Sequence, residues 1–185
     1  MTMKSNTKKL TLNAILLAMG LLIHQLTPAI GLPMQPDISL AMMFIIMILN
    51  KDDYKICLVA GIVTGIFAAL TTKFPGGQVP NILDKTVTIN IMFMIMYIIY
   101  KLPFMKNLSN KKQDLIVATI IFPIGTIVSG TAFLLFAQVI VGLPGGSFIA
   151  LFMVAVVPAI LINLIAGLLL FKVVSMSIRR VSYQG

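Results

Sequence analysis

A polar stretch at residues 73–90, KFPGGQVPNILDKTVTIN, lies between long runs of apolar residues. It contains Gln78, Asn81, Asp84 and Lys85 together with two prolines and two glycines. Polar side chains at this density, beside apolar segments long enough to cross a membrane, are costly unless they stay hydrated, pair or bind a ligand. We therefore interpret the stretch as the outward-facing half of a small-molecule site.

The spacing of Asn81 and Asp84 also has a purely structural interpretation. Asn is a common N-cap, and an acidic residue suits the positive end of a helix dipole. Lys85 does not fit this interpretation, because a cation is unfavourable at a helix N-terminus. It must reach the surface, pair with Asp84 or Asp37, or bind an anion. The combination suits a zwitterion whose carboxylate faces Lys85 and whose ammonium faces an aspartate.

Two further residues at the same end are candidates for ligand contacts. Asp37 follows Pro36 at the start of an apolar segment, where it is either an N-cap or a residue that covers the ligand. Phe74 is either a wall on which an aromatic ligand stacks or an anchor at the membrane interface. Both are kept as candidate site residues.

Polar residues also occur inside the apolar segments: Asn90, Thr126, Gln138 and Asn163. Side chains of this kind usually form hydrogen bonds between helices. Gln138 lies near the outer end of its segment and is the best candidate among them for a ligand contact. His24 lies about a turn below the outer surface, where it is either a packing residue, the interpretation we favour, or a ligand contact.

Several kinds of catalytic and nucleotide-binding motif are missing from the chain. It has no G-x-x-x-x-G-K sequence, no G-x-S-x-G sequence, no glutamate and a single histidine. The first absence argues against ATP binding in a P-loop, and the single histidine argues against a histidine-based metal site. The sequence therefore predicts no enzymatic activity, no metal and no cofactor.

The composition indicates an integral membrane protein. Of the 185 residues 59% are hydrophobic and only 10% are charged, against about 25% in soluble domains. At about 20 residues per span, the chain has room for six transmembrane helices and no second domain. We expect a single all-α membrane domain over residues 1–185, with spans at about 10–29, 37–50, 54–72, 81–101, 113–141 and 147–177.

The net charge of +9 reflects topology and does not indicate nucleic-acid binding, because the basic residues lie at span ends. Twelve of the fourteen lysines and arginines fall in the two terminal segments and in the second and fourth loops, which all lie on one side of the expected bundle. Lys73 and Lys85 lie on the opposite side. This bias predicts that both termini are cytoplasmic. The opposite face carries the glycine- and proline-rich loops and is expected to form the mouth of the site.

Two small-residue patterns allow helices to approach closely: Ala14-x-x-x-Ala18 and Gly61-x-x-x-Gly65. Packing within the bundle explains either pattern. Ala14 and Ala18 lie in the cytoplasmic half of the first span, where a partner subunit is also able to reach them.

Three segments resemble the substrate-binding S components of energy-coupling-factor transporters, and specifically their tryptophan-transporter branch. They are Pro36-Asp37, residues 61–88 (GIVTGIFAALTTKFPGGQVPNILDKTVT) and residues 141–146 (VGLPGG). The resemblance extends over about residues 10–172. It implies a six-helix bundle that captures tryptophan outside the cell with high affinity.

The same resemblance implies partners. Such a subunit docks on a transmembrane coupling protein driven by two ATPase subunits, and Ala14-x-x-x-Ala18 matches the docking motif of the family. ATP would then be used by the partners, which accounts for the missing nucleotide site.

The main alternative is a self-sufficient secondary transporter for an aromatic amino acid or a related small molecule. It requires ion-coupling groups in the middle of the membrane, whereas the five aspartates are expected near span ends.

Overall fold

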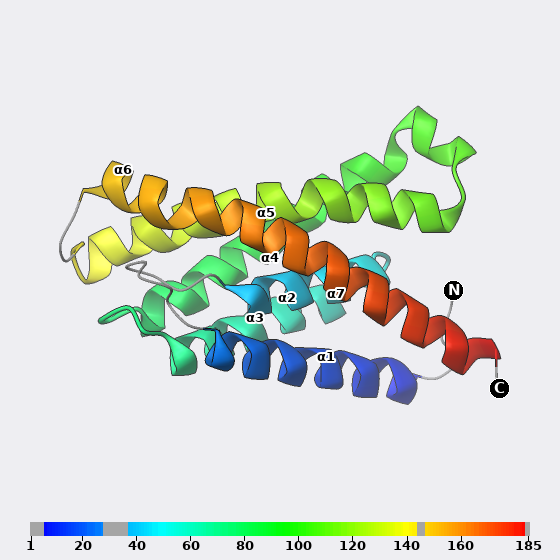
Figure 1. Cartoon of the computed structure of the whole chain (residues 1–185), viewed down its shortest axis with the longest axis horizontal. Coiled ribbons are helices and arrows are strands. Elements are labelled where there is room, and N and C mark those ends of the chain that lie inside the picture. Colours follow the sequence, from blue (N-terminus) through cyan, green and yellow to red (C-terminus); the bar gives the residue numbers. More distant parts are fainter. Residues whose placement is uncertain (1–5, 28–36, 144–146, 184–185) are drawn as a thin grey trace.

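The computed structural model describes residues 6–27, 37–143 and 147–183, with side chains from residue 7 to residue 178. The described residues form helices and no strands (Figure 1). The elements are α1 (Asn6–Leu26), α2 (Ile38–Leu49), α3 (Tyr54–Thr71), α4 (Gln78–Lys101), the 3₁₀ turn η1 (Pro103–Asn107), α5 (Asn110–Ile140), α6 (Phe148–Leu151), the π-helical turn η2 (Phe152–Val156) and α7 (Val157–Tyr183). The predicted all-α class is confirmed.

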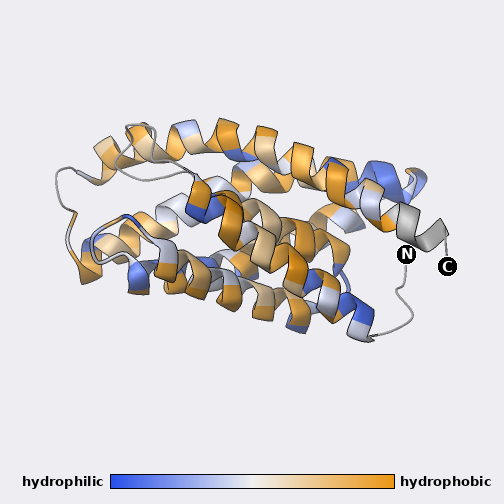
Figure 2. Cartoon of the chain, turned by 60° about the horizontal axis from the view of Figure 1, so that its bottom comes forward, coloured by the Kyte–Doolittle hydropathy of each residue, from blue (hydrophilic) through white to orange (hydrophobic). Residues whose placement is uncertain are grey.

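Five helices of the described chain are long and apolar enough to cross a membrane, the last of them being the continuous run Phe148–Ile178. Many large apolar side chains on these helices are exposed, Leu70, Leu22 and Leu161 among them. Figure 2 shows apolar residues along most of the length of the helices. A surface of this kind suits lipid and would be costly in water.

The short helix α2 is the sixth apolar segment, and it differs from the other five. With 12 residues it is about 18 Å long, against about 30 Å for the hydrocarbon core of a bilayer. Every residue from Ser39 to Ile48 is buried, and α2 packs against α1, α3, α4, α5 and α7. Helix α2 is therefore the centre of the bundle, surrounded by longer helices, and its length alone does not make it a sixth span.

The ends of the bundle differ in character. Helix α1 begins and α7 ends at one end, where the α4–α5 connection with its several lysines also lies (Figure 1). The α3–α4 loop lies at the opposite end (Figure 1). This arrangement agrees with the division of basic residues between the two ends in the sequence.

The start of α4 differs from the prediction. The helix begins at Gln78 with Gly77 as its N-cap, so Asn81 is not the N-cap. Pro80 lies in the first turn, where a missing N–H leaves no hydrogen bond unmade, and the helix therefore starts before it. Asn81 instead donates from Nδ2 to the Gly77 carbonyl at 2.8 Å. In contrast, Asp37 does cap α2, accepting from the Leu40 amide at 3.3 Å.

Close helix contacts depend on small residues. A Cβ on Gly61 would lie 2.4 Å from Cγ2 of Ile89, and one on Gly65 would lie 3.0 Å from Cα of Ile82. The pattern Gly61-x-x-x-Gly65 is thus explained by packing of α3 on α4. On α5, a Cβ on Gly125 would lie 2.2 Å from the ring of Phe44, which is fully buried on α2.

The contact between Gly125 and Phe44 leads to a first prediction. Gly125→Ala is expected to lower the stability of the detergent-solubilised protein by about 1–3 kcal/mol, the usual cost of overpacking a core. Adding Phe44→Leu, which removes the end of the ring, should recover part of the loss, so the two changes are not additive. Thermal unfolding followed by size-exclusion chromatography measures both effects. Ile127→Ala, at an exposed position of α5, is the control; strictly additive losses would contradict the proposed contact.

Candidate functional site

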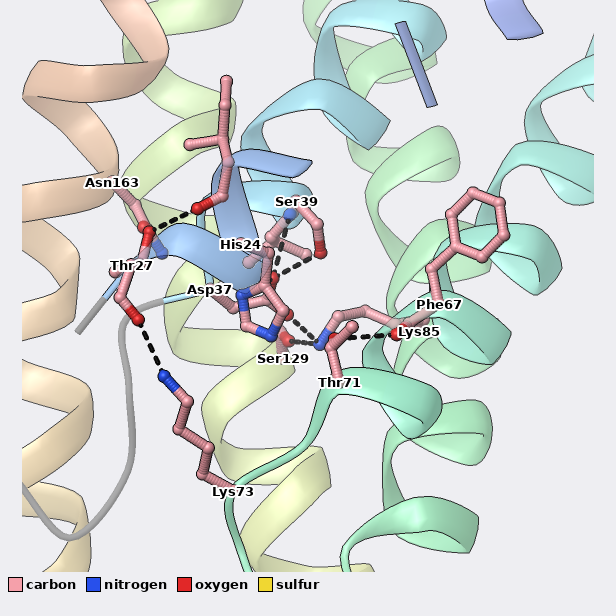
Figure 3. Close-up of polar contacts among 12 residues, drawn as sticks. His24, Thr27, Asp37, Ser39, Phe67, Thr71, Lys73, Lys85, Ser129 and Asn163 are labelled. Carbon is pink, nitrogen blue, oxygen red and sulfur yellow. Dashed lines mark hydrogen bonds and ion pairs between the residues drawn. The ribbon is translucent and has the colours of Figure 1, made fainter. Parts of the chain in front are cut away.

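A buried ion cluster joins α2 to α4. Nζ of Lys85 lies 2.7 Å from Oδ2 of Asp37 (Figure 3). It also pairs with the carboxylate of Asp84. Lys85 is 2% exposed and Asp84 is 0% exposed. Since residue 85 lies seven positions after Gln78, the first residue of α4, the ammonium group is reached about 10 Å along the helix from its start. The three residues were all predicted as site residues, and the predicted alternative in which Lys85 pairs with Asp84 or Asp37 is confirmed for both.

Hydroxyl groups complete the hydrogen bonding of this cluster. Ser129 on α5 accepts from Lys85 at 3.2 Å and donates to Oδ2 of Asp84 at 3.0 Å. Thr88, one turn after Asp84, donates to Oδ1 of Asp84 at 2.9 Å. Ser39 donates to Oδ1 of Asp37. Charges are tolerated in a buried place only when they are paired and hydrogen-bonded in this way.

The cluster brings acidic and basic side chains together. Two carboxylates face one ammonium, and Nδ1 of the buried His24 on α1 lies 3.5 Å from Oδ1 of Asp37. Two carboxylates therefore share one ammonium group, and an imidazole lies beside one of them. A ligand ammonium that approached the carboxylates would be attracted to them.

The cluster lines a cavity of about 80 Å³. Part of its wall is aromatic, because Phe74 and Phe133 meet edge to face with their ring centroids 5.3 Å apart. Another part is made of small apolar side chains from the π-helical turn and the start of α7: Ala155, Val156 and Ala159. Pro158, which has no backbone N–H, is the second residue after this turn, and π-helical turns of this kind are frequent at functional sites.

Two polar residues predicted to join helices also line the cavity. Nδ2 of Asn163 on α7 donates to Oγ1 of Thr126 on α5 at 3.2 Å. Asn90 is likewise paired between helices, accepting from the Tyr54 hydroxyl at 2.5 Å, although away from the cavity. The predicted interhelical hydrogen bonds of these residues are therefore confirmed.

The structure brings five of the seven predicted binding residues into one place. Asp37, Phe74, Asn81, Asp84 and Lys85 all line the cavity. Gln78 and Gln138 are exposed and do not line it. Gln138 lies next to the buried Ala137, so it points away from the face of α5 that carries Ser129 and Phe133.

Four residues that contact the ion cluster or line the cavity were not predicted from the sequence: Thr88, Ser129, Phe133 and Ser39. Thr88 lies four residues after Asp84, which is the spacing of neighbours on a helix face, and this signal was available. Ser129 and Phe133 share such a spacing on α5, but nothing in the sequence indicates that this face meets α4.

Ala14 and Ala18 lie elsewhere, on the outside of the bundle. Both are exposed on α1, in a stripe that continues to the exposed Leu10 and Leu22 at the same four-residue spacing. Within the described chain the internal packing of α1 therefore does not account for these two small residues.

These features define a class: a multi-pass membrane protein whose helices enclose a charged, partly aromatic cavity. The chain belongs to the family described as "Tryptophan transporter TrpP", whose model matches residues 6–179. The tryptophan-transporter branch identified from the sequence motifs is thereby confirmed.

Curated relatives agree over nearly the full length. The chain is 50% identical to a "Probable tryptophan transport protein" of Clostridium perfringens over 98% of this chain and 99% of the relative. It is 48% identical to one of Clostridium acetobutylicum, over 98% of this chain and all of the relative, and 40% identical to one of Bacillus subtilis, over 96% of each. No solved structure matches.

The charge cluster leads to a second prediction. Lys85→Met leaves the buried carboxylate of Asp84 and the partly buried one of Asp37 without their ammonium, and we expect it to cost about 3–5 kcal/mol of stability. Asp84→Asn, which removes one of the two carboxylates, should be milder, and combining it with Lys85→Met should recover part of the loss. Thermal unfolding in detergent measures the series, with the exposed Lys55→Met as control. Unfolding of Lys85→Met at the wild-type temperature would show that the pair is not buried.

Proposed function

We propose that this chain captures tryptophan in the cavity beside Lys85. The observation that supports this most is that one cavity combines charges of both signs with two aromatic rings, in a chain of the tryptophan transporter family. The carboxylate of the ligand faces Lys85 and its ammonium faces Asp37 and Asp84. The indole packs against Phe74 and Phe133, where aromatic pairs gain free energy beyond the area that they bury.

The volume of the cavity sets a condition on this mode of binding. At about 80 Å³ it is smaller than the roughly 300–1,000 Å³ of typical small-molecule sites. Tryptophan therefore enters only if side chains of the wall move apart, and changes of side-chain rotamer on binding are common. Phe74 belongs, with Thr72 and Lys73, to the part of the wall that lies in the α3–α4 loop outside any helix, and we expect this part to move.

Binding of tryptophan by the isolated chain is the third prediction. Saturating tryptophan should raise the unfolding temperature. A ligand at a hundred times its dissociation constant adds about 2.7 kcal/mol to the free energy of unfolding. The fluorescence of tryptophan should change on binding, and the chain contains no tryptophan of its own to obscure it. The double variant Lys85→Met, Asp84→Asn should lose both effects, whereas Lys55→Met should keep them. A folded wild-type protein that shows neither effect would overturn the proposal.

The transport step is proposed to use energy from partner subunits. The chain has no P-loop motif, and we infer that ATP is used by two ATPase subunits joined to this chain through a transmembrane coupling protein. The exposed Ala14 and Ala18 support a docking site on α1, because small residues let a partner helix approach the backbone closely. The chain itself then needs no cofactor.

The docking face gives the fourth prediction. Ala14→Phe together with Ala18→Phe should leave tryptophan binding unchanged, because both residues are exposed and outside the cavity. Uptake of labelled tryptophan by cells that also contain the coupling module should fall at least tenfold. Leu161→Phe with Ile165→Phe, a pair with the same spacing on the exposed face of α7, is the control and should transport normally. Normal uptake by the α1 variant would remove the docking proposal.

One observation favours the alternative of a self-sufficient secondary transporter. Asp84 is fully buried inside a span-length helix, and intramembrane carboxylates are typical of ion-coupled transport. Concentrative uptake by proteoliposomes that contain this chain alone, driven by a proton or sodium gradient, would favour that alternative over the coupled subunit.

A further inference from the structure

The amide of Asn163 is satisfied on one side only. The residue is 2% exposed and lines the cavity. Its Nδ2 donates to Thr126, whereas its Oδ1 is buried and has no hydrogen-bond partner among the described residues. An unpaired buried acceptor costs free energy, so it calls for an explanation.

Thr126 fixes which end of the amide is free. The Thr126 hydroxyl donates to the Phe122 carbonyl at 2.8 Å. A hydroxyl has one proton, so Oγ1 of Thr126 is left to accept from Asn163. The nitrogen of the amide therefore faces Thr126 and the oxygen is the unpaired end. The assignment of the two ends rests on this hydrogen-bond network.

The charged cluster and Asn163 would recognise different parts of a ligand. Lys85, Asp37 and Asp84 suit the carboxylate and ammonium that every amino acid carries, so they do not select a side chain. The rings of Phe74 and Phe133 favour an apolar side chain but discriminate poorly among similar ones. Asn163, reaching the same cavity from α7 (Figure 3), adds an acceptor beside this apolar wall.

We propose that Oδ1 of Asn163 accepts a hydrogen bond from the indole N–H of bound tryptophan and thereby determines the specificity of the site. This inference rests on the proposed function. The indole N–H is the only hydrogen-bond donor of the tryptophan side chain, and it supplies what the free amide oxygen lacks. A site built around such a donor rejects a ligand without it, because the acceptor then stays buried and unpaired.

The test compares tryptophan with benzothienylalanine, in which sulfur replaces the indole N–H and the shape is nearly kept. The readout is the ligand concentration that gives half-maximal thermal stabilisation of the purified chain. For the wild type we expect the analogue to need a concentration about tenfold to a hundredfold higher. For Asn163→Leu the two ligands should become equivalent, because tryptophan binds more weakly and the analogue does not.

Two further variants separate recognition from folding. Thr126→Val removes the hydroxyl that orients the amide, so discrimination between the two ligands should fall even though Oδ1 remains. Asn90→Leu changes an asparagine that pairs with Tyr54 away from the cavity, and it should keep the wild-type ratio. If Asn163→Leu does not fold, the ligand ratios of the wild type and of Thr126→Val still test the role of Asn163.

The outcomes distinguish this inference from the function on which it rests. Equal binding of tryptophan and benzothienylalanine by the wild type, or an unchanged ratio in Asn163→Leu, would overturn the role of Asn163 and leave tryptophan capture standing. A folded wild-type chain that binds neither ligand would overturn both.

Discussion

The structure depends on keeping two buried charged side chains, Asp84 and Lys85, paired with each other and with the partly buried Asp37 inside an apolar bundle. Lys85 satisfies Asp37 and Asp84 at once, and hydroxyls from α2, α4 and α5 take up the remaining hydrogen bonds. In a low-dielectric interior each group is tolerable only because the others are present. The cluster therefore fixes how α2, α4 and α5 pack. Because its charged side chains must stay paired, a polar cavity remains where apolar side chains would otherwise fill the core.

The position of α2 makes this arrangement possible. A helix that spanned the bilayer would place its N-terminus, and the aspartate that caps it, near the membrane surface. Helix α2 is short and surrounded, so its cap Asp37 lies beside Lys85, two turns inside α4. The cap thus serves two purposes: it satisfies the start of α2 and it supplies a carboxylate to the cavity.

Much of the site could be predicted because its charges are conspicuous in so apolar a chain. Asp37, Asp84 and Lys85 have no inexpensive place in a membrane protein unless they pair or bind something. The remaining features depend on rotation about helix axes and on which faces meet. Gln138 was expected at the cavity but points outward, whereas Ser129 and Phe133 on the same helix point inward. Periodicity is weak on helices that are apolar all round, so the sequence carries little information about such rotations.

The charges of the cluster also limit which ligands are able to replace its ion pairs. A zwitterion brings one positive and one negative charge, so binding it alters the partners of Lys85 and the aspartates but not the sum of buried charge. A purely cationic or purely anionic ligand would change that sum inside a low-dielectric cavity, at a cost that rises as the cavity closes over it. In the proposed mode of binding, pairs with the ligand would replace the ion pairs that Lys85 makes with Asp37 and Asp84, so that each side chain would meet an opposite charge in both states. This conservation of charge would favour an amino acid over a simple amine or acid, and the choice among amino acids would be left to the neutral groups of the wall.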